Sequence, residues 1–305
     1  MYQSATILIT TRNRKADLCR AIESALGQKP TTEVLLINDG SKDGTADLVR
    51  VRYPAVNLHH FPESKGYIFR RNQGAALARG DIIFSIDDDA AFSSHTIVEQ
   101  TLAEFSNPHI GAVAIPFIEP RKNNRLMQKA PDHRQTWITD RFVGTAHALR
   151  KDLFLALGGY REHLVHQGEE RDFCIRMLNR RAFVRLGNSD AIVHYESPMR
   201  SYHRMDFYGR RNDILFAWHN VPLAALPTHL LGSTAKGLLW GLKVKRPLIM
   251  VCGLLFGYAA CAKNFRQRRP VSRSTCRLFR RLGEFGPLPI DELLPSDGGN
   301  PKLET

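Results

Sequence analysis

The chain has 305 residues, of which 43% are hydrophobic and 24% charged. This composition is too apolar for a disordered protein, and the length can bury a substantial core as one large domain or as one domain with an appendage. The formal net charge is +13, but residues 222–281 contain 12 Lys and Arg and no Asp or Glu. The remaining 31 basic residues nearly balance the 30 acidic ones. The positive charge therefore belongs to one C-terminal segment, which predicts a partner with a negative surface there.

The five cysteines are odd in number and show no Cys-x-x-Cys spacing. This pattern argues against a disulfide framework and against a zinc site, and it favours a reducing compartment. The N-terminal sequence MYQSATILIT has no basic region followed by a long apolar run. We therefore expect no signal peptide and a cytoplasmic protein.

Short apolar strands alternate with amphipathic helices through the first 90 residues. The predicted strands are 5–11, 33–39 and 81–87, and the predicted helices are 15–26, 43–53 and 72–80. Strands and helices that alternate at this spacing indicate βαβ units and a parallel sheet. Such sheets bind ligands beyond the carboxyl ends of their strands, which is where Asp39 and the acidic run 87–89 lie.

Beyond residue 100 the pattern becomes mixed. We expect a strand over 109–117, a polar loop over 118–140, and a strand that leads into a helix over 142–160 and ends at a Gly-Gly pair. The predicted organisation has three parts, and they are an α/β domain at 1–220, a basic and apolar helical segment at 221–285, and a disordered tail at 286–305.

Three adjacent carboxylates, Asp87, Asp88 and Asp89, close the apolar run of the predicted strand 81–87. Adjacent like charges repel, and a divalent cation compensates them most simply; oxygen ligands suit Mg²⁺ or Mn²⁺, which bridge substrate phosphates. In an extended chain Asp87 and Asp89 point to the same side, so these two are expected to serve the ion and a nucleotide. The alternative is a solvated loop or a helix cap, but the run lacks the Gly or Pro of a turn.

Six motifs in order resemble family 2 glycosyltransferases of the GT-A fold. They are TTRNR (10–14), INDGSKDGT (37–45), RRNQGAALARGD (70–81), IDDDA (86–90), GEERDFCIRMLNRRAFV (168–184) and IVHYES (192–197). A seventh, FYGRRNDILFAWHN (207–220), is similar to a helix of bacterial members that act on cell-surface polysaccharides. Each motif alone is weak, but their order and spacing together are specific, and the likeness covers roughly residues 4–215.

The resemblance implies transfer of a sugar from a nucleoside diphosphate to an acceptor hydroxyl, with inversion at the anomeric carbon. Asp87 and Asp89 are similar to the family's D-x-D, which would hold Mg²⁺ or Mn²⁺ against the diphosphate and assist its departure. The residues implied to bind the nucleotide sugar are Thr11, Arg12, Asp39, Arg71, Asp87 and Asp88.

Three of these residues carry an open alternative. Asp39 is equally a turn residue before Gly40, and Arg71 is equally an arginine on the surface of a helix. Arg12 stands where the family often has Tyr, so its contact with the donor is left open.

An inverting displacement needs a general base, and the helix start GEERDFCIRML offers Glu169, Glu170 and Asp172. At helical spacing Glu170 shares a face with Phe173 and Cys174, so we expect its carboxylate to face inward and to be partly desolvated. The family's acidic pair similarly puts the base second, which favours Glu170 as the catalytic residue. The alternative is that all three carboxylates only stabilise the helix N-terminus.

His194 follows the apolar AIV at another expected strand end. Related enzymes use a His in this region as an additional metal ligand, so the resemblance implies His194 beside Asp87 and Asp89; a structural His is the alternative. Arg210 and Arg211, in the seventh motif, either meet phosphate or are only solvated, and solvation is the simpler expectation.

The apolar run PLIMVCGLLFGYAACA (247–262) lies between the basic clusters KVKR and KNFRQRR. It is shorter than the roughly 20 residues needed to span a bilayer. A short apolar helix between basic clusters is typical of a segment in the interface of an anionic membrane. We therefore expect peripheral attachment to the inner face of the cell membrane through 222–281. The alternatives are a helical hairpin packed on the core and a re-entrant hairpin.

Two other functions are compatible with parts of the sequence. A nucleotidyl- or phosphoryl-transferase also uses carboxylates and a metal, but TTRNRK has neither a P-loop nor a glycine cluster. A nucleic-acid binder would use the basic tail, which lacks interleaved aromatics or a recognisable module. The expected partners are a nucleoside-diphosphate sugar, a glycan or lipid-linked acceptor and an anionic membrane surface, and no nucleic acid.

Overall fold

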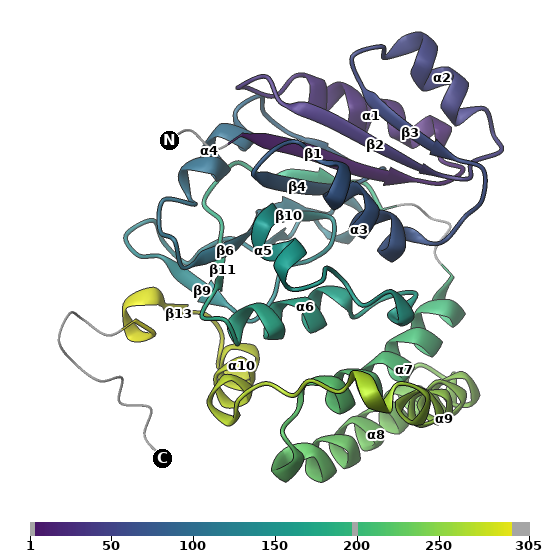
Figure 1. Cartoon of the computed structure of the whole chain (residues 1–305), viewed down its shortest axis with the longest axis vertical. Coiled ribbons are helices and arrows are strands. Elements are labelled where there is room, and N and C mark those ends of the chain that lie inside the picture. The colour runs from purple at the N-terminus through teal and green to yellow at the C-terminus, as the bar shows by residue number, and fades with distance from the viewer. Residues whose placement is uncertain (1–3, 197–200, 295–305) are drawn as a thin grey trace.

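A computed structural model describes residues 4–196 and 201–294 (Figure 1). A nine-stranded sheet forms its centre, in the order β13-β9-β11-β6-β10-β4-β1-β2-β3. Four neighbouring strands run parallel, and they are β1 (Ala5–Thr11), β2 (Glu33–Asp39), β3 (Asn57–Phe61) and β4 (Ile82–Asp87). Their carboxyl ends therefore meet at one edge of the sheet.

The other half of this sheet is mixed. Its strands are β6 (Ile110–Ala114), β9 (Trp137–Thr139), β10 (Ala146–Arg150), β11 (Phe183–Leu186) and β13 (Leu288–Pro289). β10 lies antiparallel between β4 and β6, whereas β11 pairs parallel with β6. The predicted α/β class with a mostly parallel sheet is confirmed, because β6 and β11 run in the same direction as β1 to β4.

Helices cover the sheet and continue beyond its edge (Figure 1). Those of the α/β part are α1 (Lys15–Leu26), α2 (Thr45–Arg52), α3 (Tyr67–Leu77), α4 (Ile97–Ala103), α5 (Lys151–Ala156) and α6 (Glu169–Leu178). α3 packs on β1 and β2 closely enough that a Cβ at Gly74 would overlap the Leu8 side chain. This helix begins at Tyr67, five residues before the predicted start, after Gly66 at φ 90°.

A second, four-stranded sheet lies beside the parallel edge, in the order β5-β12-β7-β8. Its strands are β5 (Ala90–Phe92), β7 (Phe117–Ile118), β8 (Leu126–Met127) and β12 (Ile192–His194). β12 pairs antiparallel with β5, and this register sets His194 opposite Ala90. The predicted polar loop 118–140 thus contains short strands of both sheets.

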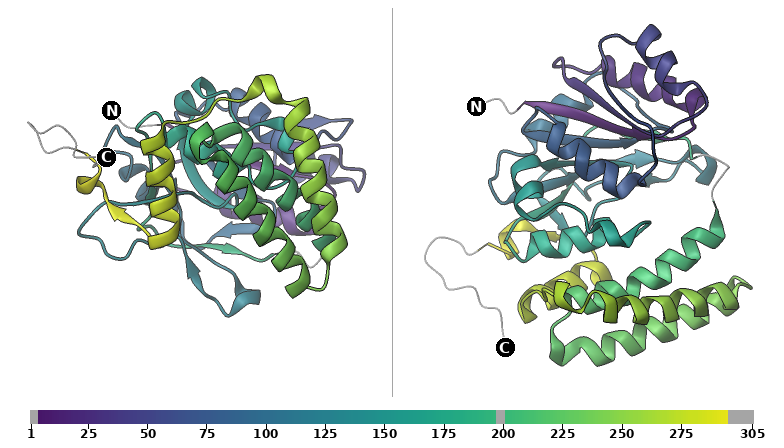
Figure 2. Two further views of the ribbon diagram at one scale, coloured as in Figure 1. Left: turned by 90° about the horizontal axis from the view of Figure 1, so that it is seen from below. Right: turned by 45° about the vertical axis from the view of Figure 1, so that its right-hand side comes forward.

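Four helices follow, and they are α7 (Tyr202–Asn220), α8 (Leu226–Lys243), α9 (Pro247–Lys263) and α10 (Arg273–Phe285). α7, α8 and α9 form a layer beyond α6, with α8 and α9 outermost (Figure 2). α9 lies directly on the α7 backbone because Gly253 and Gly257 face it. A Cβ at Gly253 would come within 2.6 Å of the Phe207 carbonyl oxygen, and one at Gly257 within 2.9 Å of the Arg211 carbonyl oxygen.

The predicted disordered tail from 286 is wrong for its first residues. β13 pairs with β9, and Ile290, in the 3₁₀ turn Ile290–Glu292, is buried in the core. The apolar side chain of Ile290 supplies the burial that a polar tail lacks. The rest of the predicted tail, 295–305, lies outside the described residues.

The apolar run 247–262 forms α9, and one face of this helix packs on α7 while the other is exposed. Met250, Leu254 and Cys261 are buried, whereas Leu248 and Leu255 are exposed. The helix thus has the packing of the hairpin alternative and keeps an apolar outer face. Among the described residues no helix is long and apolar enough to cross a membrane.

Candidate active site

The candidate site lies where the carboxyl ends of β1, β2 and β4 meet. The parallel register sets Thr10 opposite Asp87 and Thr11 opposite Asn38. Asp88 and Asp89 form the turn that joins β4 to β5, and this turn contains neither Gly nor Pro. The acidic run therefore lies at the ligand-binding edge of the parallel strands, as predicted.

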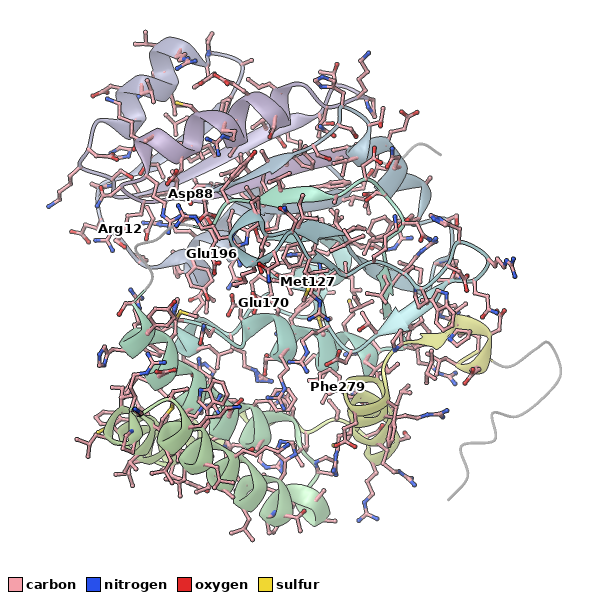
Figure 3. All side chains as sticks on the ribbon, turned by 180° about the vertical axis from the view of Figure 1, so that it is seen from behind. Arg12, Asp88, Met127, Glu170, Glu196 and Phe279 are labelled. Atoms are coloured by element: carbon pink, nitrogen blue, oxygen red, sulfur yellow. The ribbon has the colours of Figure 1, made fainter. Side chains whose placement is uncertain are left out.

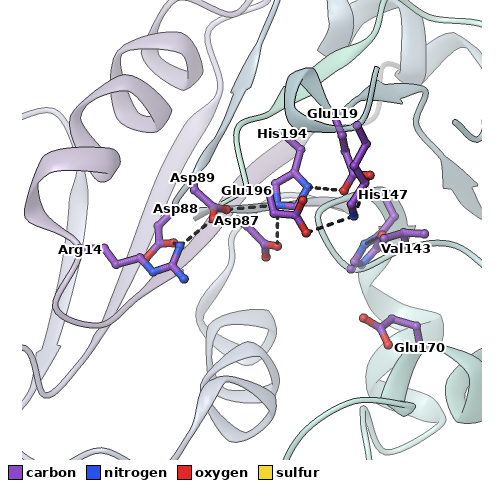
Figure 4. Close-up of polar contacts among 12 residues, drawn as sticks. Arg14, Asp87, Asp88, Asp89, Glu119, Val143, His147, Glu170, His194 and Glu196 are labelled. Carbon is purple, nitrogen blue, oxygen red and sulfur yellow. Dashed lines mark hydrogen bonds and ion pairs between the residues drawn. The ribbon is translucent and has the colours of Figure 1, made fainter. Parts of the chain in front are cut away.

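Asp88 and Asp89 are nearly buried, at 7% exposure each. Thr11 Oγ1 donates a 2.7 Å hydrogen bond to Asp88 Oδ2. Arg14 Nη1 lies 3.3 Å from Asp88 Oδ1 and 2.7 Å from Asp89 Oδ2 (Figure 4). Burial raises the pKa of Asp88 to about 7, although the Arg14 charge and the Thr11 hydrogen bond lower it. The two aspartates are thus fixed by residues of β1 and the following loop.

Asp87, Asp89 and His194 form a cluster that fits a divalent cation. One ligand atom from each lies within 4.8 Å of the others. His194 Nε2 lies 3.4 Å from Asp89 Oδ1 and 4.0 Å from Asp87 Oδ2. This nitrogen is buried and makes no hydrogen bond with the described residues. An imidazole nitrogen left without a hydrogen bond between two carboxylates is what a metal ligand requires.

Glu119 fixes the orientation of the His194 ring from behind. His194 Nδ1 and Glu119 Oε1 are 3.1 Å apart (Figure 4), which is the usual arrangement of a metal-ligating imidazole. Burial lowers the pKa of His194, but the carboxylates of Asp89, Asp87 and Glu119 outweigh it and raise the pKa above 6.5. Sequence reasoning identified His194 but did not identify Glu119.

Arg71 joins this cluster to the carboxylates of α6. Its Nη2 donates a 2.6 Å hydrogen bond to Asp87 Oδ1, and its Nη1 lies 3.6 Å from Glu169 Oε1 and 4.0 Å from Glu170 Oε1. Arg71 is buried at 6% exposure, so the alternative of a surface helix arginine is wrong. Burial lowers the pKa of Arg71, but the charges of Asp87, Glu169 and Glu170 outweigh it and raise the pKa.

The α6 carboxylates have different environments. Glu169 is fully buried, and burial together with the Glu170 charge raises the pKa of Glu169 well above 4.5. Asp172 is buried in ion pairs with Arg176 and Arg161, at 3.0 and 3.4 Å. The partly desolvated Glu170 expected from the sequence agrees with its intermediate burial, but Glu169 and Asp172 are buried more deeply. The Glu170 side chain keeps 21% exposure and is the α6 carboxylate that a substrate can reach.

Asp39 is buried and engaged by its own chain. Its carboxylate accepts hydrogen bonds from Ser64 Oγ (2.6 Å), the Lys65 and Gly66 amides (2.8 and 3.0 Å) and Arg70 Nε (2.7 Å). These bonds outweigh burial and lower its pKa. Asp39 therefore holds the loop that precedes α3, which places Arg71.

Arg12 is exposed and makes no hydrogen bond or ion pair with the described residues. It lies toward the outside of the site, whereas Asp88 lies deeper (Figure 3). Arg14, two residues later, makes the contacts with the acidic run. Sequence reasoning missed this role, although Arg14 belongs to the TTRNR motif.

A cavity of about 380 Å³ opens beside Glu170. It lies between the loop before β10, the start of α6 and the helix α7, and its lining includes Tyr67, Gly144, Glu170 and Arg210. A Cβ at Gly144 would overlap Glu170 Oε1 and come within 2.9 Å of Arg71 Nη1. The absence of a side chain at 144 thus leaves the room that these two groups occupy.

Comparison with known proteins identifies the family. The model of the family described as glycosyl transferase family 2 matches residues 6–161. A pre-mycofactocin glycosyltransferase of Mycobacterium tuberculosis is 26% identical over 225 residues, which are 68% of this chain and 46% of that protein. The chain thus spans about half the length of this relative. A glucosyl-dolichyl phosphate glucuronosyltransferase of Haloferax volcanii is 23% identical over 224 residues, 64% of this chain and 69% of that protein.

Solved structures share the fold at low sequence identity. A mannosyltransferase of Pyrobaculum calidifontis in complex with GDP-Man and Mn²⁺ superposes with a TM-score of 0.59 at 18% identity, over 93% of this chain and 81% of that chain. GalNAc-T7 with UDP, GalNAc and Mn²⁺ gives a TM-score of 0.61 at 13% identity, over 88% and 58%. The family match and these neighbours agree with the arrangement of the central sheet. The chain belongs to glycosyl transferase family 2 and has the GT-A fold.

Proposed function

We propose that the protein transfers a sugar from a nucleoside-diphosphate sugar to a hydroxyl of a lipid-linked or polysaccharide acceptor, with inversion and with the help of Mg²⁺ or Mn²⁺. One observation carries this proposal. The cluster of Asp87, Asp89 and His194 and the reachable carboxylate of Glu170 lie on either side of a single residue, Arg71.

Asp87, Asp89 and His194 would hold the cation, which supplies charge neutralisation of the departing diphosphate. Thr11 and Arg14 keep Asp88 and Asp89 in place through the contacts described above. The nucleotide-binding roles of Asp39, Asp88 and Arg12 remain part of the proposal, with Asp39 acting through the loop that it holds. GDP-Man with Mn²⁺ in the Pyrobaculum enzyme is the kind of ligand that such a site takes.

Glu170 acts as the base. As the acceptor oxygen bonds to the anomeric carbon, its proton passes to the Glu170 carboxylate, and the bond to the diphosphate breaks with its electron pair on the leaving oxygen. Attack from the side opposite the leaving group inverts the configuration. The cavity beside Glu170 gives the acceptor access to this face.

The test is the reaction of Glu170→Gln with a panel of UDP- and GDP-sugars and Mn²⁺. The control is Glu99→Gln, at an exposed position of α4. Release of nucleoside diphosphate should fall by about 10²–10⁴-fold in Glu170→Gln while donor binding persists. An unchanged rate in this variant, or a product that retains the donor's anomeric configuration by NMR, would contradict the proposal.

The proposal also places the protein on an anionic membrane surface through residues 221–285. Six apolar side chains of α8 and α9 are each at least 60% exposed, and they are Leu231, Leu239, Leu242, Leu248, Leu255 and Phe256. Exposed lysines flank them, and 222–281 contains no acidic residue. An apolar face framed by positive charge complements anionic lipid head groups and the acyl boundary beneath them. The glucosyl-dolichyl phosphate named for the Haloferax relative is consistent with such a location.

A further inference from the structure

Three arginines from separate elements converge on the cavity beside Glu170. Arg141 comes from the loop before β10, Arg171 from α6 and Arg210 from α7, and all three line the cavity. Glu170 and Asp213 are the acidic residues of the same lining. The metal cluster lies on the other side of Arg71, so this group of arginines is separate from the proposed donor site.

The arginines retain unused hydrogen-bond donors. Arg171 Nη1 and Arg210 Nη2 share one carboxylate, that of Asp213, at 3.1 and 3.0 Å. Arg171 Nε is buried and makes no hydrogen bond with the described residues. Arg141 bonds through Nε to Asp140 Oδ2 at 2.6 Å, and among the described residues its two terminal nitrogens make no hydrogen bond. Arg171 and Arg210 thus share one carboxylate, and each guanidinium group keeps N–H donors for a ligand at the cavity wall.

The surroundings of Arg171 make its charge costly without a ligand. The Arg171 guanidinium stacks on the Phe216 ring at 3.8 Å, and its side chain is 27% exposed. Burial lowers the pKa of Arg171, and the nearby charges of Arg141 and Arg210 lower it further, although Asp213 opposes them. Like charges gathered in a partly dry cavity are compensated by a bound anion.

The arrangement favours a phosphate over a carboxylate. A planar carboxylate is satisfied by one bidentate guanidinium. A phosphate offers three terminal oxygens in a tetrahedral arrangement, which suits N–H groups that approach from several directions. Here the donors approach from a loop and two different helices. A volume of about 380 Å³ also accommodates more than the phosphate itself.

We propose that the cavity lined by Arg141, Arg171 and Arg210 is an acceptor subsite that binds a phosphate group carried by the acceptor, next to the hydroxyl that Glu170 deprotonates. This inference rests on the proposed function, because it assigns the acceptor side of that reaction. The phosphate belongs either to a polyprenyl phosphate head group or to a soluble phosphate ester.

The test is calorimetric titration in EDTA, which removes metal and so silences the donor site. The probes are inorganic phosphate, glycerol 3-phosphate and farnesyl phosphate, and the proteins are the wild type, Arg210→Gln and Arg141→Gln. The matched control is Arg204→Gln, at an exposed position of α7 outside the cavity. Arg141 is half exposed, so its variant tests the subsite even if Arg210→Gln disturbs α7.

We expect at least one phosphate ester to bind to the wild type without metal. Its affinity should be about tenfold or more lower for Arg210→Gln and Arg141→Gln, and the same for Arg204→Gln as for the wild type. Binding of farnesyl phosphate alone would assign a lipid head group, and equal binding of glycerol 3-phosphate a soluble ester. No binding of any probe, or binding that both cavity variants leave unchanged, would overturn the proposal. Mn²⁺-dependent binding of nucleoside diphosphates, measured on the same protein variants in buffer without EDTA, reports the donor site separately and should be unaffected by either variant.

Discussion

Gly144→Ala tests the packing that places the proposed base. The added Cβ would overlap Glu170 Oε1 and lie 2.9 Å from Arg71 Nη1, where ordinary contacts begin at 3.4 Å. Arg71 must therefore retreat by about 0.5 Å, and the Glu170 carboxylate by more. Arg71 is fixed to Asp87 by a 2.6 Å hydrogen bond, so the Glu170 side chain moves most.

Displacing a catalytic group by about 1 Å costs about 100-fold in rate, which corresponds to about 2.7 kcal/mol in activation free energy. We expect a loss of this order in kcat for Gly144→Ala, with the donor KM nearly unchanged because the metal cluster is not displaced. The assay is Mn²⁺-dependent release of nucleoside diphosphate from whichever donor the wild type accepts.

Gly232→Ala is the matched control, because nothing lies within 4 Å of a Cβ there and Ala is the better helix former. It should keep full activity and equal or greater stability. Full kcat in Gly144→Ala would refute the reasoning that Gly144 makes room for a catalytic Glu170.

Three further results are expected. The raised pKa of buried Glu169 means that the folded state holds its proton more tightly than the unfolded state, so its contribution to stability is complete below about pH 4.5 and is lost as pH rises. Urea unfolding should therefore show the free energy of unfolding of Glu169→Gln increasing relative to that of the wild type as pH rises. Parallel pH profiles of the two proteins would contradict this. Gly257→Leu should lower the free energy of unfolding by about 1–3 kcal/mol, because a Cβ at this position comes within 2.9 Å of the α7 backbone. Thermal melts measure this loss, with Gly232→Ala as the control. An unchanged Tm in Gly257→Leu would count against close packing of α9 on α7. Phe256→Glu, at a 60% exposed position, should abolish co-sedimentation with phosphatidylglycerol vesicles and leave Mn²⁺-dependent nucleotide binding intact; undiminished vesicle binding would argue against membrane contact through α9.

Much of the parallel half of the sheet is predictable from local sequence. The apolar runs at 5–11 and 33–39 are buried along nearly their whole length, as strands covered on both faces require. β3, with the sequence NLHHF, is only partly buried at the sheet edge and has no such run, so its sequence gave no signal. The antiparallel insertion of β10 depends on pairing between distant segments, which no local pattern records.

The sequence predicted the part of the candidate site whose residues lie at the ends of strands. The acidic run and His194 meet because β12 pairs with β5, which carries His194 to the turn that holds Asp89. Helical periodicity alone did not predict the burial of Glu169 in α6. The pattern assigns buried positions to apolar residues, whereas Glu169 is buried beside the charge of Arg71. The contacts of Arg14 depend on loop conformation, and the convergence of arginines on the cavity depends on the docking of α7. No sequence motif predicts either arrangement.

The central claim is that Asp87, Asp89 and His194 hold a divalent cation that binds the donor diphosphate. Calorimetric titration of UDP, dTDP and GDP, each with and without Mn²⁺, tests it on the wild type, on Asp89→Asn and on the control Asp132→Asn, which lies outside the cluster. The account predicts that one nucleotide binds only with Mn²⁺, that Asp89→Asn loses this binding while its circular dichroism is unchanged, and that Asp132→Asn keeps it. Binding that needs no metal, or that survives intact in Asp89→Asn, would contradict the account.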